Sequence, residues 1–383
     1  MLATENSHLS NYLEDSVEDT HKLLADLVAI PAPSHREEKR AEFVKAWLEA
    51  LGAEGVYIDN AKNAVYPLLV GDGDDIVVFE AHTDTVFPDT TPFELRSDGT
   101  NFYAPGVGDD TCSLAILLTV VRYIVQNNIK PKRSILFVAN SCEEGLGNLK
   151  GTKQLMEDYK GRVKELYTFD GKYPAVCDTC VGSHRYEIEC KTIGGHSFGA
   201  FGNPNAIHEL SKLIASLYAI EIPNKAGTKT TYNVGMIEGG TSVNTIAQSA
   251  KMLYEYRSDD VECLEYMKHA FEASVAAARA EGKAEFDVNV VGIRPCGLDV
   301  DEEVFSAMKR LVESTMEKHT GSAARYHSGS TDCNVPRSLG IPALCPGVYQ
   351  GGGAHTREEY VSIASIATGL KIAADIILHY FKL

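Results

Sequence analysis

The sequence predicts an α/β fold with two domains: a mainly parallel sheet covered by helices, and a ferredoxin-like α/β domain inserted into it. The chain has 383 residues, more than one hydrophobic core usually organises. In its first third, short and almost wholly apolar runs alternate with amphipathic helices, as in parallel sheets that carry helices on both faces. After about residue 183 the order changes to β-α-β-β-α-β, which is the order of a ferredoxin-like sandwich.

Residues 1–183 contain the elements expected of the first part of the parallel-sheet domain. Helices are predicted where apolar residues recur at three- and four-residue spacing, and covered strands where a short run is apolar throughout. The predicted helices are 16–30, 35–53 and 111–128, and the predicted strands are 74–81, 133–141 and 164–171.

The inserted domain is predicted over residues 184–294. Its first strand alternates polar and apolar residues like a half-exposed strand, and the helix that follows starts from an Asn cap. The predicted elements are strand 185–193, helix 203–220, strands 230–240 and 247–259, helix 260–282 and strand 285–294. Helix–strand alternation then returns, so residues 295–383 are expected to complete the first domain.

Composition excludes several classes of partner. A formal net charge of -17 argues against nucleic acid and against anionic membrane surfaces. No apolar run reaches the length of a membrane span, and MLATENSHLSNYLEDS lacks the basic and apolar regions of a signal peptide. Nine scattered cysteines, with only Cys177 and Cys180 closely spaced, indicate reduced thiols and not a disulfide framework or a zinc knuckle. These features predict a cytoplasmic protein.

Side chains that bind metals stand at the ends of successive predicted strands or in loops. Ligands of open α/β sheets gather where the carboxyl ends of the strands meet the loops. The candidates are His82 and Asp84 in HTDTV, Asp109 and Asp110 in GVGDDT, Glu143 and Glu144 in EEG, Asp170 in FDG, and His355 in AHTREE.

Each candidate also has an ordinary structural explanation. Asp109 could cap the helix predicted to begin at Thr111, and Asp170 before a glycine could be a turn residue. The two adjacent glutamates could lie in a solvated loop, and His355 in a flexible one. A shared metal site explains all of these positions together.

These motifs, in this order, resemble those of the co-catalytic zinc exopeptidases and deacylases, the family that includes carboxypeptidase G, peptidase T, aminoacylase and acetylornithine deacetylase. The resemblance covers nearly the whole chain and implies a zinc-exopeptidase catalytic domain with an inserted lid. It implies two zinc ions per chain, with Co²⁺ or Mn²⁺ as substitutes for a mixed N/O ligand set. His82 and Asp170 would hold one ion, Glu144 and His355 would hold the other, and Asp109 would bridge them.

Two residues beside these ligands, Asp84 and Glu143, are expected to support catalysis without binding a metal. Asp84 is expected on the same strand face as His82, where its carboxylate can accept the second N–H of the imidazole. Glu143 is left without a metal, and the resemblance makes it the general base. It also implies a cis peptide bond between Asp109 and Asp110.

The inserted domain supplies candidates for substrate binding. The resemblance implies that His196 in TIGGHSFG polarises the scissile carbonyl, often across a dimer interface, although a histidine after two glycines can be only a turn residue. Asn244 and Arg257 stand at family positions that bind substrate, and Arg294 is a third candidate. A guanidinium fork matches a carboxylate, but salt bridges explain either arginine equally well.

The expected activity is zinc-dependent hydrolysis of an amide bond, by an exopeptidase that acts on di- and tripeptides through metal-activated water. The alternative is an N-acyl-amino-acid deacylase, because the same centre attacks any unactivated amide. A non-catalytic relative would lack a ligand or the base, and none is missing. A homodimer formed through the lid is also expected. Departures from the family pattern after Asp110 and after His196 leave the substrate open.

Overall fold

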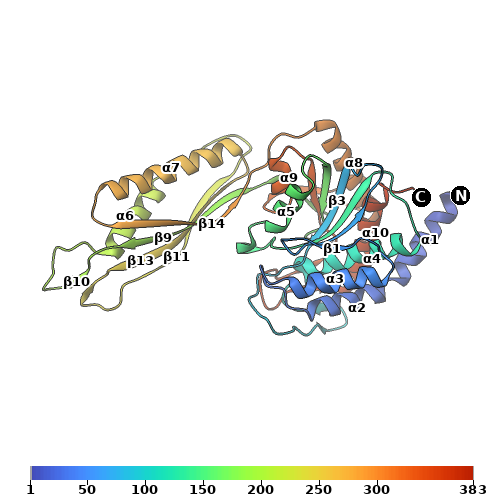
Figure 1. Cartoon of the computed structure of the whole chain (residues 1–383), viewed down its shortest axis with the longest axis horizontal. Helices are drawn as coiled ribbons and strands as arrows, with labels where there is room; N and C mark the ends of the chain where they lie inside the picture. The colour runs from blue at the N-terminus through green and yellow to red at the C-terminus, as the bar shows by residue number, and fades with distance from the viewer. Residues whose placement is uncertain (1, 383) are drawn as a thin grey trace. The chain divides into compact units, whose positions relative to one another are not determined.

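The chain folds into two compact units, as the computed structural model of residues 2–382 shows (Figure 1). The first unit runs up to Thr179 and resumes at Asp299, and the second comprises Cys180–Leu298. The second unit therefore interrupts the first, and its ends lie a few residues outside the range 184–294 expected from the sequence.

The first unit is built on an eight-stranded sheet with the strand order β1-β2-β6-β3-β7-β16-β8-β15. The four central strands, β6, β3, β7 and β16, run parallel to one another, whereas β1 pairs antiparallel with β2, β2 with β6, and β8 with β16. The sheet is thus mainly parallel at its centre, as the apolar runs predict. The strands are β1 (Tyr57–Ile58), β2 (Ala64–Leu68), β3 (Ile76–His82), β6 (Ser134–Asn140), β7 (Val163–Thr168), β8 (Ala175–Cys180), β15 (Arg325–Gly329) and β16 (Ala343–Pro346).

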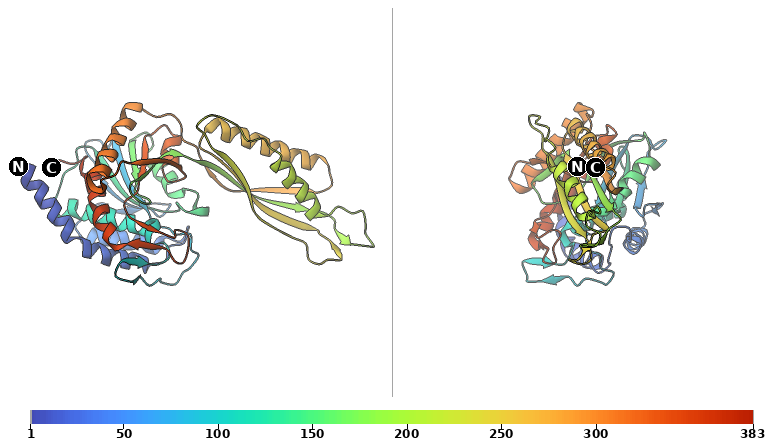
Figure 2. Two further views of the ribbon diagram at one scale, coloured as in Figure 1. Left: turned by 180° about the vertical axis from the view of Figure 1, so that it is seen from behind. Right: turned by 90° about the vertical axis from the view of Figure 1, so that its left-hand side faces the viewer.

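Helices cover both faces of this sheet (Figures 1 and 2). Every residue of β3 and β6 is buried, because each strand has neighbours on both sides and helices above and below. The first helix, α1, lies before the first one predicted from the sequence. The helices are α1 (Leu2–Asp15), α2 (Val17–Val28), α3 (Glu38–Ala50), α4 (Ser113–Gln126), α5 (Lys150–Asp158), α8 (Glu302–Thr320), α9 (Asn334–Ser338) and α10 (Ile363–Leu378).

One face of the sheet carries the main hydrophobic core. Phe79 of β3 stacks against Tyr167 of β7 with ring centroids 5.4 Å apart and against Phe137 of β6 at 5.9 Å. Helices α4 and α10 pack on each other and contribute buried side chains to the same cluster. This packing holds the parallel strands rigidly and therefore fixes where their carboxyl ends lie.

The first unit also contains a small second sheet. Its strands are too short for a periodic pattern, and the sequence did not predict them. They lie in the order β17-β18-β5-β4 and are β4 (Arg96–Ser97), β5 (Asn101–Tyr103), β17 (Gly351–Gly352) and β18 (Tyr360–Ser362).

The second unit has the predicted order β-α-β-β-α-β, with an antiparallel sheet in the order β11-β13-β9-β14. Asn205 caps its first helix by accepting hydrogen bonds from the N–H groups of Ile207 and His208. A two-stranded ribbon, β10 with β12, extends from one end. The elements are β9 (Gly182–Lys191), β10 (Gly195–His196), α6 (Ala206–Tyr218), β11 (Thr230–Gly239), β12 (Thr245–Ile246), β13 (Ser249–Ser258), α7 (Val261–Ala280) and β14 (Glu285–Arg294).

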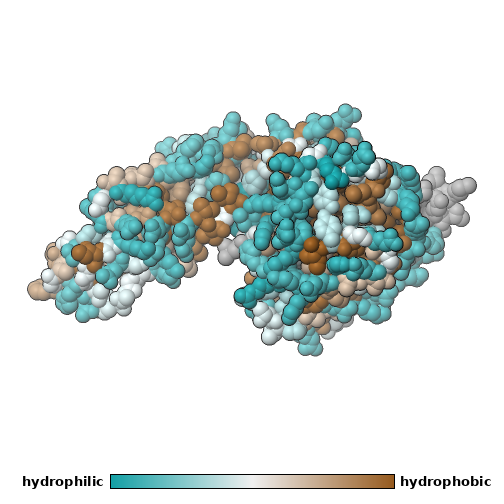
Figure 3. Space-filling view, in the orientation of Figure 1, coloured by the Kyte–Doolittle hydropathy of each residue, from teal (hydrophilic) through white to brown (hydrophobic). Residues whose placement is uncertain are grey.

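The surface is mainly polar on the face that the space-filling view shows, and hydrophilic residues cover most of that face (Figure 3). Among residues 2–382, no helix combines the length and the apolar character needed to cross a membrane. No disulfide joins any of the nine cysteines within the same residues.

Candidate metal centre

The candidate ligands of the first unit meet at one edge of the parallel sheet. His82 is the last residue of β3, Glu143 and Glu144 follow β6, and Asp170 follows β7. Since β3 is parallel to both β6 and β7, these strand ends lie at the same edge. The sheet topology alone therefore brings together residues that are distant in sequence.

Two groups of potential ligand atoms share Asp109. One group contains His82, Asp109 and Asp170, and the other contains Asp109, Glu144 and His355; within each group the atoms lie within 4.8 Å of one another. Asp109 Oδ1 is 3.0 Å from His82 Nε2, and Asp109 Oδ2 is 3.2 Å from His355 Nε2. Glu144 Oε1 is also 3.2 Å from His355 Nε2. Each oxygen of Asp109 thus faces a different histidine, which is the arrangement of a carboxylate that bridges two cations.

The imidazole of His82 is oriented for metal binding. Its Nδ1 lies 3.0 Å from the main-chain oxygen of Asp84, and because a carbonyl oxygen only accepts, Nδ1 must donate. Nε2 then faces Asp109 Oδ1, and these two atoms can approach only with a proton or a metal cation between them. The donor set of two imidazoles and three carboxylates suits Zn²⁺ and related divalent ions.

The charges of the cluster also indicate a site for cations. Burial raises the pKa of Asp170 well above its usual range, and the nearby charge of Asp109 adds to this effect. Burial likewise raises the pKa of Glu144 to about 7, although a hydrogen bond from His355 opposes the shift. Burial also acts to raise the pKa of Asp109, but the hydrogen bonds with His355 and His82 outweigh it and leave that pKa well below its usual range. The clustered carboxylates repel one another, and bound cations would remove that repulsion.

The carboxylate of Asp84 lies near His82 Nδ1, but the regular geometry of strand β3 does not extend to it. Strand β3 ends at His82, so the regular alternation of faces stops before Asp84. Its carboxylate Oδ1 is 3.5 Å from His82 Nδ1 and accepts a hydrogen bond from the backbone N–H of Glu143 at 2.9 Å, and its Oδ2 accepts one from the backbone N–H of Glu144 at 3.0 Å. The main-chain oxygen of Asp84 orients the imidazole, and its carboxylate positions the two glutamates.

Glu359 positions the loop that carries Asp109, and the sequence did not single it out. Its carboxylate is buried and accepts from the backbone N–H groups of Gly106 at 2.9 Å, Gly108 at 2.8 Å and Asp109 at 2.8 Å. In this loop the peptide bond between Asp109 and Asp110 is cis. The side chain of Asp109 caps no helix, so the alternative that Asp109 is only a helix cap is wrong.

Glu37 and Arg40 are two further buried charges that sequence reasoning missed. Arg40 is fully buried at the start of α3 and donates to the backbone oxygen of Thr83 at 2.7 Å, directly after His82. Glu37 accepts from the N–H of Cys142 at 3.2 Å, directly before Glu143. Both occur in a stretch rich in charged residues, where the sequence offers no signal that separates them from exposed neighbours.

Glu143 lies in a buried polar environment near Asp332. The carboxylate of Asp332 accepts from Asn140 Nδ2 at 2.6 Å and from Thr152 Oγ1. Burial raises the pKa of Asp332 to about 7, and the charge of Glu143 adds to this shift. Asp332 belongs to the segment HSGSTDCN, for which the sequence suggested a place in the pocket.

The second unit holds its four candidates in two separate places. His196 of β10 pairs with Thr245 of β12, next to Asn244, whose main-chain oxygen accepts from Ser197 N at 3.0 Å. Arg257 and Arg294 both pair with Ser183, from either side of β9.

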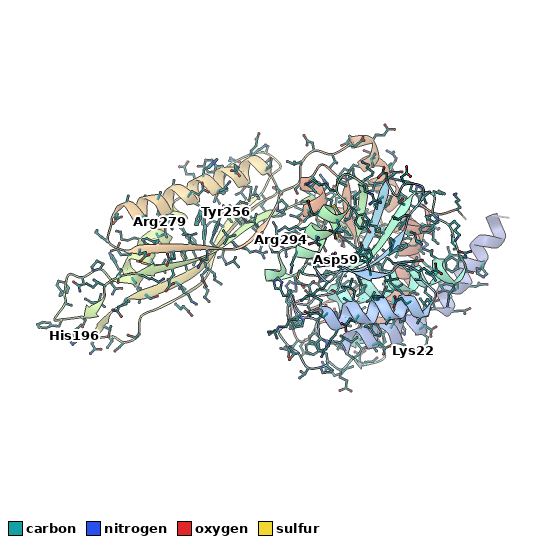
Figure 4. All side chains as sticks on the ribbon, in the orientation of Figure 1. Lys22, Asp59, His196, Tyr256, Arg279 and Arg294 are labelled. Carbon is teal, nitrogen blue, oxygen red and sulfur yellow. The ribbon has the colours of Figure 1, made fainter. Side chains whose placement is uncertain are left out.

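The two pairs lie at opposite ends of the unit, as the positions of His196 and Arg294 in Figure 4 show. Arg257 is partly exposed on the inner strand β13, and its guanidinium is already engaged, since Nε and Nη2 both donate to Glu255 at 2.9 Å. Arg294 is buried at the end of β14. The structure thus favours the salt-bridge explanation for Arg257.

The parallel-sheet scaffold and the paired ligand groups define the class of the protein, a metal-dependent hydrolase. Residues 78–379 match the profile of peptidase family M20/M25/M40, and the chain belongs to that family.

Individual relatives cover nearly the whole chain. A succinyl-diaminopimelate desuccinylase of Corynebacterium glutamicum is 25% identical over 94% of this chain and 96% of its own. A solved tripeptidase of Staphylococcus aureus superposes with a TM-score of 0.74 at 23% identity, over 94% of this chain and 97% of its own. A dinuclear metal-binding peptidase of Bacillus subtilis gives a TM-score of 0.64 at 16% identity, over 96% and 99% of the two chains.

Proposed function

We propose that the protein hydrolyses amide bonds with two divalent metal ions held by His82, Asp109, Glu144, Asp170 and His355. The observation that carries this proposal is Asp109, whose two oxygens face two different histidines at 3.0 and 3.2 Å. Zn²⁺ is the metal we expect, because imidazole and carboxylate ligands suit it, with Co²⁺ or Mn²⁺ as substitutes.

Bound cations would supply the positive charge that makes water a nucleophile near neutral pH and stabilises a developing oxyanion. Glu143 is the residue we assign to proton transfer. The backbone N–H of Glu143 donates to the carboxylate of Asp84 at 2.9 Å. This hydrogen bond fixes the loop that presents the Glu143 carboxylate, next to Glu144. As general base Glu143 takes a proton from the attacking water, and as general acid it gives that proton to the nitrogen of the leaving amine. His196 is the residue we assign to hydrogen bonding with the carbonyl oxygen.

The substrate class we propose is a short peptide, cleaved by an exopeptidase that accepts di- and tripeptides. The similarity to a solved tripeptidase supports this choice. The similarity to a desuccinylase favours a second candidate, an N-acyl-amino-acid deacylase. Both substrates present an unactivated amide bond beside a charged end, so a common centre serves either.

A homodimer is the assembly we propose, formed through the second unit. Strand β11 is an edge strand of its sheet, and most of its residues are exposed. Ile237 in β11 and Val290 in the other edge strand, β14, are both more than half exposed. Edge strands with apolar side chains invite pairing with another chain, and a second copy is the simplest partner. A cytoplasmic location stays a prediction.

The test is the exchange of Glu143 for glutamine. Glu143→Gln keeps the shape of the side chain but cannot accept a proton, so turnover should fall by about 10²–10⁴-fold while two metals per chain remain bound. The substrate panel should contain dipeptides, tripeptides and N-acetyl amino acids, and metal content is measured by elemental analysis. Glu157→Gln, on the exposed side of α5, is the matched control. Near-normal turnover in Glu143→Gln would assign the base elsewhere.

A further inference from the structure

The turn after His196 is built around the side chain of that histidine. His196 Nδ1 accepts hydrogen bonds from the backbone N–H groups of Phe198 at 3.3 Å and Gly199 at 3.2 Å. Its main-chain oxygen accepts from Ala200 N at 2.9 Å. This is the geometry of a helix N-cap, in which a side-chain acceptor satisfies the second and third N–H groups of the first turn.

The two glycines before His196 allow this turn to form. Gly194 and Gly195 have φ angles of 63° and 139°, which side-chain-bearing residues rarely adopt. A Cβ atom at Gly195 would lie 2.7 Å from Cβ of Ala200, so the turn folds back closely over the glycine. The segment GGHSFGA is therefore shaped to bring the N–H groups of Phe198 and Gly199 to the imidazole.

This geometry determines where the imidazole carries its proton. Both N–H groups point at Nδ1, so Nδ1 must offer a lone pair, and the single proton of the neutral ring lies on Nε2. The ring of His196 is exposed, and within residues 2–382 no hydrogen bond from Nε2 to the protein is present. Nε2–H is thus left as an outward donor.

We propose that the backbone N–H groups of Phe198 and Gly199 are positioning groups that hold His196 in the Nε2–H tautomer, so that a neutral imidazole presents a hydrogen-bond donor to the carbonyl oxygen of the substrate. The use of this donor rests on the proposed function, whereas the tautomer itself does not. A donor that is oriented before substrate binds costs no reorganisation when negative charge develops on the oxygen.

The tautomer can be read directly by NMR on the full-length protein with ¹⁵N-labelled histidine, at a pH where the ring is neutral. The resonances of His196 are identified as those missing from His196→Gln. We expect Nδ1 to show the shift of an unprotonated ring nitrogen and Nε2 that of a protonated one. A wild-type protein with the proton on Nδ1 would overturn the proposal.

Two variants distinguish the loss of the Gly199 N–H group from the effect of adding a side chain at this position. Gly199→Pro removes one donor to Nδ1, and Gly199→Ala keeps it, with a new Cβ atom 3.8 Å from Nδ1, an ordinary contact distance. We expect Gly199→Ala to retain the wild-type tautomer and Gly199→Pro to shift the Nδ1 resonance toward the protonated form. An Nδ1 resonance in Gly199→Pro identical to that of the wild type, in a protein with unchanged melting temperature, would overturn the role of the Gly199 N–H in selecting the tautomer.

Kinetics then distinguish a failure of this inference from a failure of the proposed function. Loss of orientation should lower kcat more than it raises KM, by less than the about 10²–10³-fold expected when an oxyanion donor is removed altogether. If the tautomer is as predicted but His196→Ala hydrolyses substrate as fast as the wild type, the positioning stands and the catalytic role of His196 falls.

Discussion

Asp109 shows how much chemistry depends on one side chain in this protein. Its carboxylate is the only candidate ligand that belongs to both groups, with one oxygen toward His82 and the other toward His355. A bridging carboxylate typically holds two metals about 3.5–4 Å apart, close enough to act on one substrate oxygen. Loss of an outer ligand should weaken one metal position, whereas loss of Asp109 should weaken both.

Asp109→Ala should therefore bind less than one metal ion per chain after exhaustive dialysis and should lose amide hydrolysis. Elemental analysis of the purified chain measures this, together with the melting temperature to show that the fold persists. Asp158→Ala, at an exposed position of α5, is the control and should keep two ions. Two metals retained per chain in Asp109→Ala would contradict the bridging role.

At the scale of elements, backbone hydrogen bonds to buried carboxylates place the ligands. Asp84 binds the N–H groups of Glu143 and Glu144, and Glu359 binds three N–H groups of the loop that ends at Asp109. Hydrogen bonds from backbone N–H to a charged acceptor are among the strong ones, at about 1.5–3 kcal/mol each. These two carboxylates hold ligand loops at the ends of rigid strands.

Glu359→Gln should lower metal affinity by about 10–100-fold, as loss of partners behind the ligands typically does. The amide has only one acceptor oxygen, and its NH₂ group would face a backbone N–H donor. A metal-buffered titration measures the affinity. Glu358→Gln changes the adjacent, exposed glutamate, whose only ion pair in the described part of the chain is a 3.8 Å contact with Arg96, and should leave the affinity unchanged. Equal affinities in the two variants would remove Glu359 from the centre.

The elements that could be predicted from sequence were those with a strong local pattern. The buried strands β3, β6 and β7 are predictable because each is a mostly apolar run. The ligand motifs follow these strands, and the carboxyl ends of parallel strands lie at the same edge of a sheet. Glu37, Arg40 and Glu359 could not be found in this way. Their burial results from contacts with distant loops, and a charged residue among charged neighbours carries no local sign of it.

Asp84 illustrates the limit of periodicity for a predicted site residue. Alternation correctly placed it near His82, but the strand ends at His82, and the role of its carboxylate depends on the loop after β6. The two-residue strands β4 and β17 are likewise too short to leave a period in the sequence. Predictions failed where the structure depends on contacts between distant segments and not on the periodicity of polar and apolar residues within one segment.

At the scale of the whole molecule, the second unit separates two sets of candidate substrate contacts. Arg257 and Arg294 flank Ser183 near one end of β9, while His196 lies beyond Lys191, at the other end. At about 3.3 Å per residue, this strand alone separates them by roughly 25 Å, more than a di- or tripeptide spans. If His196 and the two arginines of one chain all serve catalysis, they must contact different substrate molecules. In a dimer, one of these two sets could contact the substrate bound at the active site of the partner chain.

This separation leads to a test of shared active sites. Chains with His196→Ala and chains with Glu143→Gln should each be inactive alone. If His196 serves the site of the neighbouring subunit, a hybrid dimer contains one site with an intact Glu143 from one chain and an intact His196 from the other. Random exchange makes about half of the dimers hybrids with one restored site each, so recovery should approach about one quarter of wild-type activity.

The control mixes His196→Ala with a chain that carries both substitutions, because no combination of these subunits restores a complete site. Native mass spectrometry with differently tagged chains measures the hybrid fraction, and recovered activity should rise in proportion to it. Recovery also requires the edge strands and apolar residues of the second unit to pair with another copy, so a chain that stays monomeric would show none. Hybrids that form without recovery would place His196 in the site of its own chain or outside catalysis, and the end-to-end separation within the second unit would then reflect only the length of its sheet.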